Sequence, residues 1–198
     1  LLKAGRDAGD PTIDRLITIR RVSPIVEALK GIVEKRDAFR EKQRIVHVAN
    51  GVIDLRDDND VTFVPFSADF YSRNQSPVAY REGATCSRFI KELLEPAIDP
   101  DDISLLQRFM GLTLLGRNLP QRFLILDGTA GAGKGTLVRI ITELVGRASC
   151  GQLRTESLFG RFEVAHYIGK TLLEGSDVPG DFLSRTGASA LKALVGGD

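Results

Sequence analysis

Cysteine and histidine are scarce in this 198-residue sequence, which contains two of each. Cys86 and Cys150 lie far apart, without Cys-x-x-Cys spacing and without a histidine-rich neighbourhood. Structural zinc sites and disulfide frameworks need closely patterned ligands, so the sequence indicates neither. His47 stands alone in an apolar segment, where a histidine is more typical of packing than of metal binding.

Long apolar runs are absent as well. No stretch approaches the roughly 18 residues that a membrane-spanning helix needs, and the first residues do not form a signal peptide. We therefore expect a cytoplasmic protein with no membrane partner. The 42% hydrophobic fraction is that of an ordinary globular core. The net charge of +1 neither favours nor excludes nucleic acid, because basic groups can be confined to one patch.

The most informative stretch is residues 121–136, QRFLILDGTAGAGKGT. Residues 123–126 form an apolar run typical of a strand buried on both faces. A glycine-rich loop follows, and after it a helix ending near Gly146, with one apolar face made of Leu137, Ile140, Ile141 and Leu144. Strand, glycine loop and helix are the context of a phosphate-binding loop, because loop N–H groups and the helix N-terminus point at one anion.

The spacing of Gly128, Gly133 and Lys134 fits the Walker A pattern, except that Gly135 replaces the usual Ser or Thr. A hydroxyl follows at Thr136. Either Thr136 supplies a magnesium ligand, or carboxylates and phosphate hold the metal. The sequence thus predicts ATP and Mg²⁺ as ligands, with Lys134 reaching the β- and γ-phosphates. The predicted phosphate-binding residues are Gly128, Thr129, Ala130, Gly131, Ala132, Gly133, Lys134, Gly135 and Thr136.

A second informative stretch is residues 169–177, GKTLLEGSD. Apolar residues running into a carboxylate predict a strand that delivers an acid to the sheet edge carrying the phosphate loop. Such an acid binds Mg²⁺, and a neighbouring one can polarise the attacking water. Glu174 and Asp177 are both candidates, and the pattern alone leaves the choice open. Alternatively, one of them is an ordinary strand-end acid.

The remaining pattern predicts mostly helices around one small β element. Residues 11–22 form an amphipathic segment, and Ser23 and Pro24 are predicted to start a helix running to about residue 40. Asn50-Gly51 predicts a hairpin between residues 45–49 and 52–55, with a further strand at 61–64. Helical spacing resumes at 86–94 and at 103–116, the latter after an acidic cap at residues 99–102, and again at 184–195.

Five segments together resemble the primase-helicases of phages, plasmids and poxviruses, which carry a superfamily 3 helicase of the AAA+ class. The segments are HVANGVIDL (47–55), SLLQRFMGLTLLG (104–116), QRFLILDGTAGAGKGTL (121–137), GKTLLEGSDVP (169–179) and LKALVGGD (191–198). The resemblance extends from about residue 45 to the end of the chain.

This resemblance implies an α/β fold, in which an AAA+-type P-loop core with a parallel sheet flanked by helices follows a smaller helical and β region. The expected parts are residues 1–83, a helical lead-in at 84–120 and an ATPase core at 121–198, truncated before its DNA hairpin and arginine finger. It implies binding to single-stranded or forked DNA and ATP-driven unwinding of DNA in phage or plasmid replication in a bacterial host. A hexameric ring and a primase domain or replication proteins are the implied partners.

Carried over by residue, the resemblance places Asp177 at the Walker B position and so favours it over Glu174. Because the family more often has Glu at this position, the presence of Asp leaves open which residue acts as the general base. Lys192 and the pair 197–198 resemble the start of the motif before the DNA-contacting hairpin. Without an arginine finger, worth about 10³ to 10⁵ in turnover, we expect this chain to bind nucleotide far better than it hydrolyses it.

Two other functions fit parts of the pattern. Nucleoside monophosphate kinases have the same phosphate-loop sequence pattern. Against this function, about 120 residues precede the loop here and no Arg-rich lid follows it. A non-enzymatic DNA-binding or assembly module would use basic side chains of the N-terminal helices, although charge runs are more often solvated helix faces. Those side chains are Arg15, Arg20, Arg21, Lys35, Arg36 and Arg40.

Overall fold

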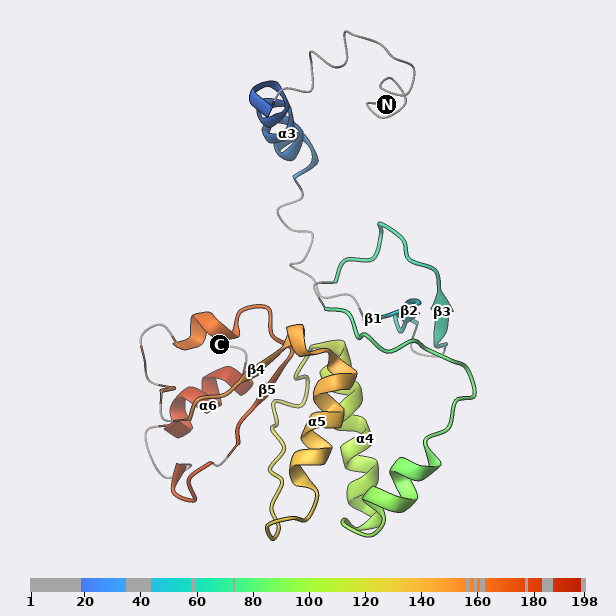
Figure 1. Ribbon diagram of the computed structural model, residues 1–198, viewed down its shortest axis with the longest axis vertical. Coiled ribbons are helices and arrows are strands. Elements are labelled where there is room, and N and C mark those ends of the chain that lie inside the picture. The colour runs from blue at the N-terminus through green and yellow to red at the C-terminus, as the bar shows by residue number, and fades with distance from the viewer. Residues whose placement is uncertain are drawn as a thin grey trace. The chain divides into compact units, whose positions relative to one another are not determined.

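The computed structural model describes residues 19–34, 44–57, 60–72, 74–155, 157–158, 160, 163–176, 178–182 and 187–196 (Figure 1). The chain divides into two compact units, Leu1–Glu41 and Lys42–Asp198. The hairpin belongs to the second unit, together with the expected lead-in and core. Within the described ranges, no helix combines the length and the apolarity needed to cross a bilayer.

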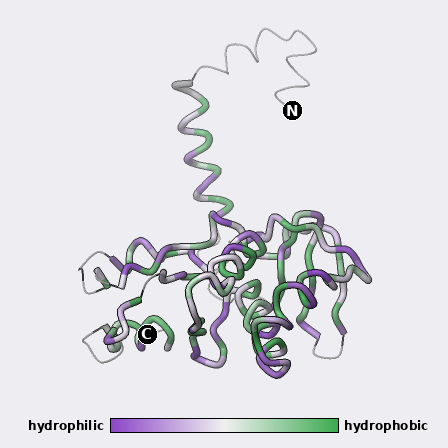
Figure 2. Tube along the Cα trace, turned by 60° about the horizontal axis from the view of Figure 1, so that its bottom comes forward, coloured by the Kyte–Doolittle hydropathy of each residue, from purple (hydrophilic) through white to green (hydrophobic). Residues whose placement is uncertain are grey.

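Helix α3 (Ile19–Val33) is the described element of the first unit. It begins before the predicted cap, so Pro24 lies inside the helix and the prediction of a start at Ser23 is wrong. Val22 extends the apolar face by one turn toward the N-terminus, which explains the earlier start. Pro24 has no backbone N–H group, so the helix lacks one backbone hydrogen bond there. The exposed apolar side chains of α3 are those of Ile25, Val26, Leu29, Ile32 and Val33. Hydrophobic and hydrophilic residues alternate along the turns of this helix in Figure 2.

The second unit opens with an antiparallel three-stranded sheet, β1 (Ile45–Val48), β2 (Gly51–Asp54) and β3 (Thr62–Val64), in the order β1-β2-β3. The three predicted strands are confirmed, but the turn is shifted by one residue. Val48 pairs with Gly51, so Ala49 and Asn50 form the turn. Gly51 instead serves close packing, because a Cβ there would lie 2.7 Å from the Phe63 ring and from the Val64 carbonyl oxygen.

Two helical elements lead toward the glycine loop. The predicted helix at 86–94 is mainly a π-helix, η1 (Phe89–Leu94). Helix α4 (Pro100–Leu115) follows and ends at Gly116, whose φ of 63° gives the left-handed cap that glycine favours. Asp99 occupies the N-cap, yet its side chain makes no capping hydrogen bond. Asp101 and Asp102 lie in the first turn, where the helix dipole favours negative charge.

Helix α5 (Lys134–Val145) lies beside α4, and the parallel pair β4 (Cys150–Gln152) and β5 (Leu172–Glu174) lies beyond it (Figure 1). Strand β5 was predicted, whereas β4 was not. The core between these elements is one cluster of buried side chains. Its members are Leu94, Leu106, Leu137, Ile141, Val145 and Cys150.

A second cluster lies between β5, the 3₁₀ helix η3 (Glu163–Tyr167) and α6 (Gly187–Gly196). It contains Leu158, Tyr167, Phe182 and Leu191, so the predicted inward position of Leu191 is confirmed. The buried Tyr167 hydroxyl donates to Glu163 Oε1 at 2.9 Å. Burial raises the pKa of Tyr167.

Residues 123–126 differ from the sequence prediction. The structure gives them no strand pairing among the described residues. Leu124 and Leu126 pack against the first core cluster, whereas Phe123 is 45% and Ile125 63% exposed. One face of this segment is therefore buried and the other open, instead of both being buried. A strand needs a ladder partner on at least one edge, which explains why apolarity alone did not decide the structure.

Candidate functional site: a glycine loop at the start of helix α5

The loop before α5 has the backbone conformation that its glycines predict. Gly128, Gly131 and Gly133 adopt φ values of 150°, 82° and 83°. These values favour glycine, because a Cβ there would strain the backbone. Gly133 is the N-cap of α5, and no described side chain caps this helix end. The first N–H groups of α5 thus remain available to an anion.

Lys134 folds back over the loop that precedes it. Its Nζ donates to the carbonyl oxygens of Gly128 at 2.6 Å and Thr129 at 2.9 Å. A Cβ on Gly128 would lie 4.0 Å from this ammonium group. The loop and the lysine therefore form one compact arrangement of backbone amides and a single positive charge. This is the donor set that phosphate oxygens require.

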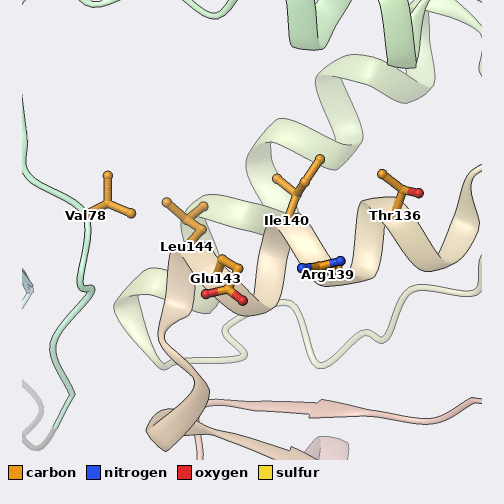
Figure 3. A pocket seen from close by; sticks show the side chains of 6 residues that line it. All are labelled: Val78, Thr136, Arg139, Ile140, Glu143 and Leu144. Atoms are coloured by element: carbon orange, nitrogen blue, oxygen red, sulfur yellow. The ribbon is translucent and has the colours of Figure 1, made fainter.

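The outer face of α5 carries an open groove of ≈ 490 Å³, which runs from the first turn of the helix toward its last (Figure 3). Its lining combines apolar side chains with those of Thr136, Arg139 and Glu143. Of the predicted apolar face of this helix, Leu137 and Ile141 are buried, whereas Ile140 and Leu144 line the groove and are only partly buried. The lining residues are Val78, Thr136, Arg139, Ile140, Glu143 and Leu144.

Thr136, the predicted source of a magnesium ligand, is exposed in the first turn of α5 and lines this groove. The charge of Glu143, two turns further, is already matched by Arg147, whose guanidinium donates to Glu143 Oε1. That hydrogen bond lowers the pKa of Glu143. Arg139, one turn before Glu143, is the basic residue among those that line this groove.

The two candidate acids are placed differently. Glu174 ends β5, and its Oε2 accepts a hydrogen bond from Thr142 Oγ1 at 2.9 Å. Thr142 follows Lys134 by eight residues in α5, which corresponds to about 12 Å along the helix axis. The structure therefore brings Glu174 to the far half of α5 and not to the glycine loop. Asp177 lies outside the described residues.

A metal site is not assembled by the residues that the structure describes. They contain no group of three or more His, Cys, Asp or Glu side chains suited to hold an ion. Thr136 supplies one oxygen near the loop, and Glu174 is engaged by Thr142. The described donor set thus fits the phosphates of a nucleotide better than it fits Mg²⁺.

Sequence reasoning missed the residues that fix the far end of α5. We call residues 74–80 the strap. Ser76 in the strap is buried and donates through Oγ to the Leu144 carbonyl oxygen at 2.6 Å. Gln75 Nε2 donates to the Val48 carbonyl oxygen, and Ala49 N to that of Val78. The strap thereby joins the hairpin to α5. Its sequence lacks periodicity, so no local signal could predict this contact.

The approach of η1 to the loop was also not predicted. The Leu93 side chain lies 3.6 Å from the position of a Cβ on Gly133, the N-cap of α5. A π-helix often occurs at a functional site, because the extra residue redirects a side chain. Here η1 places Leu93 against the loop and Leu94 in the core cluster. Helical periodicity had indicated only an ordinary amphipathic helix.

The basic side chains of the DNA-binding alternative cannot be placed. Arg15, Lys35, Arg36 and Arg40 lie outside the described residues, as do the side chains of Arg20 and Arg21. Gly197 and Asp198 also lie outside them, whereas Lys192 is exposed on α6.

No curated protein matches this chain. Residues 126–198 match the model of a family described as "Family of unknown function (DUF5906)". The matched segment begins two residues before Gly128 and contains the glycine loop, α5, β4, β5 and α6. The glycine loop and the acid-bearing strand thus lie within one family segment, whose description assigns no activity.

Proposed function

We propose that this chain binds a nucleoside triphosphate, specifically ATP, through the loop of residues 128–136. We further propose that it belongs to the ATPase motor of a superfamily 3 DNA helicase. In that assembly, hydrolysis between subunits of a ring drives movement along DNA. The resemblance across five segments supports the helicase, and the geometry of the loop supports nucleotide binding.

The observation that carries the proposal is the position of the Lys134 ammonium group. It bonds two loop carbonyl oxygens, of Gly128 and Thr129, at the start of a helix that no described side chain caps. A lysine held there can move its hydrogen bonds from these carbonyls to phosphate oxygens within the same small region. A glycine-rich surface turn without such a role would not require a cation over the loop.

The residues of the loop perform binding and orientation. Backbone amides of the loop and of the first turn of α5 would donate to phosphate oxygens, and Lys134 would neutralise part of their charge. Mg²⁺, when bound with ATP, would neutralise further negative charge of the phosphates. Thr136 and Asp177 are the residues that we propose for the metal. We assign Glu174 to positioning, because it ties β5 to Thr142.

Titration of the chain with ATP tests the phosphate loop. The variant Lys134→Ala is expected to bind ATP about 10- to 100-fold more weakly, the effect of losing one charge-assisted contact. Lys170→Ala is the matched control, since Lys170 Nζ also donates to a backbone carbonyl, that of Ala148 at 2.7 Å. It should bind ATP like the wild type. Equal ATP affinity for Lys134→Ala and the wild type would remove the proposal.

A second pair of variants distinguishes the proposed roles of Asp177 and Glu174. Asp177→Asn should abolish the effect of Mg²⁺ on ATP affinity, because a neutral amide is a much weaker ligand for this cation. Glu174→Gln should keep that Mg²⁺ effect and lose only folding free energy, because Thr142 is its partner. The opposite result, with Mg²⁺ dependence lost only in Glu174→Gln, would exchange the two roles.

Two assays decide between the activities. Strand separation of a forked duplex in the presence of ATP would support the helicase, whereas phosphoryl transfer from ATP to AMP would identify a nucleoside monophosphate kinase. DNA binding that the addition of ATP leaves unchanged would favour the assembly module. The logarithm of the DNA affinity should then fall linearly with the logarithm of the salt concentration, with a slope of about 0.9 for each phosphate contact on duplex DNA.

A further inference from the structure

We propose that the groove along the outer face of α5 binds the base and ribose of the nucleotide whose phosphates occupy the glycine loop. The inference rests on the proposed nucleotide binding and adds to it the site that would distinguish a nucleoside triphosphate from a bare phosphate chain. Neither the Walker A pattern nor the family match assigns a function to this groove.

The groove is continuous with the loop through Thr136. This residue stands in the first turn of α5, two positions after Lys134, and it is also part of the groove lining. Ile140 lies one turn beyond it, about 6 Å along the helix axis. A nucleotide whose phosphates meet the helix N-terminus would therefore extend past Thr136 into the groove and bring its base to Ile140.

The chemistry of the lining fits an aromatic base with a polar sugar. Val78, Ile140 and Leu144 provide an apolar surface, while Thr136, Arg139 and Glu143 provide polar groups along the rim (Figure 3). A volume of ≈ 490 Å³ is typical of small-molecule sites, which combine apolar walls with a few polar groups. Arg147 already balances the negative charge of Glu143. Arg139 therefore adds a net positive charge to the groove, on the side nearer the phosphates.

The strap holds one wall of the groove in place. Val78 belongs to the strap, and its backbone carbonyl accepts a hydrogen bond from Ala49 N at 3.0 Å. Val78 N donates to Ser76 Oγ at 3.2 Å, and the same hydroxyl group donates to Leu144 O. One buried hydroxyl group therefore connects the two walls, the strap and α5. A wall fixed in this way lowers the cost of ordering the site when a ligand binds.

Calorimetric titration of the full chain with ATP and with inorganic tripolyphosphate tests the groove. The double variant Val78→Asn/Ile140→Asn should bind ATP about 10-fold more weakly, because apolar contact with the base is lost. Its affinity for tripolyphosphate should change less than about twofold. Val164→Asn is the control, since Val164 is also an exposed valine but lies on η3; it should bind both ligands like the wild type.

The outcomes separate the two proposals. If the wild type binds tripolyphosphate as tightly as ATP, or the double variant keeps wild-type ATP affinity, the groove proposal is wrong while the phosphate loop stands. If the wild type binds neither ligand, nucleotide binding fails and the groove proposal fails with it. Circular dichroism checks that the variants are folded. If the double variant unfolds, the single variant Val78→Asn replaces it in the titration, because Val78 is exposed. Its loss of ATP affinity should be smaller.

Discussion

The two ends of helix α5 are built in opposite ways. At its N-terminus, Gly133 is in a left-handed conformation, no described side chain caps the helix, and the preceding loop is exposed. At its C-terminus, Val145 and Gly146 are buried, and Ser76 donates to the carbonyl oxygen of Leu144. Four residues separate Val145, the last residue of α5, from Cys150, which completes the core on β4.

This difference separates the part of the helix that contributes to stability from the part to which we assign ligand binding. The C-terminal end, which we call the anchored end, contributes apolar burial and satisfied carbonyls. The N-terminal end, the open end, leaves N–H groups without partners, a cost that an incoming anion would recover. Changes at the anchored end should therefore alter the free energy of unfolding, and changes at the open end should alter ligand affinity.

The largest contrast is expected in thiol reactivity. Cys150 at the anchored end is buried, and its Sγ contacts the Thr142 carbonyl oxygen at 3.9 Å, whereas Cys86 is exposed. Burial, and secondarily the Glu174 carboxylate, raise the pKa of Cys150 above its ordinary value of 9.0. Reaction of Cys150 with an aromatic disulfide reagent should be slower than that of Cys86 by a factor of about 100 or more, because it requires local opening.

The variants Cys86→Ala and Cys150→Ala assign the two reaction phases. The folded chain holds the Cys150 proton more tightly than the unfolded chain does, so this contribution to stability is complete below pH 9.0. It is lost as the pH rises through the raised pKa of the folded state. Alkaline destabilisation that is smaller in Cys150→Ala would agree with this sign. Equal labelling rates for both thiols in native buffer would contradict an anchored end.

The next effect in size concerns apolar burial. Val145→Ala should lower the free energy of unfolding by about 2 kcal/mol, through lost burial and the cavity left behind. Val145 is 3% exposed. Thr136→Ala at the exposed open end should change the same free energy by less than about 0.5 kcal/mol. Urea denaturation measures both. A larger loss for Thr136→Ala than for Val145→Ala would reverse the assignment of the two ends.

Local sequence signals predicted the glycine-rich loop and the helix that follows it. The structure has α5 directly after this loop, in which Gly128, Gly131 and Gly133 each adopt a positive φ. Gly116 was expected to end α4, and does so in a left-handed conformation. Such features depend on a few neighbouring residues. The hairpin was also predictable, although its turn is Ala49-Asn50 because Gly51 must pack against Phe63.

The anchored end could not be predicted, because it depends on contacts between residues distant in sequence. Ser76 and Leu144 are 68 residues apart, and Thr142 and Glu174 are 32 apart. Strand β4 has three residues with Gly151 in the middle, where a Cβ would lie 3.1 Å from the Leu173 side chain. A run this short carries no alternation, so its pairing with β5 determines it.

A smaller effect is expected from the strap. Ser76→Ala removes the hydroxyl group that donates to Leu144 O and accepts from Val78 N. Leaving this buried carbonyl group without its donor should cost about 1–2 kcal/mol of folding free energy. Ser104→Ala on the exposed side of α4 should be near neutral. Thermal unfolding followed by circular dichroism compares them, and equal stability of the two variants would show that the strap does not anchor α5.

The smallest effect compares two glycines that have equal space and different backbone conformations. A Cβ on Gly131 in the loop or on Gly111 in α4 would meet nothing within 4 Å. Gly131 has a φ of 82°, so Gly131→Ala should lower the free energy of unfolding by about 1 kcal/mol. Gly111 is helical, so Gly111→Ala should raise it by about 0.5–1 kcal/mol.

Since neither alanine gains or loses a contact, the opposite signs would isolate backbone conformation as the cause. A stabilising Gly131→Ala would mean that the loop is not held in the left-handed conformation when no ligand is bound. The glycines would then permit that conformation only with a phosphate in place. The loop would have to reorganise on binding, and the ATP affinity of Gly131→Ala would fall although its folded state is more stable. Urea denaturation and ATP titration of the same variant together distinguish a preformed loop from one that the ligand forms.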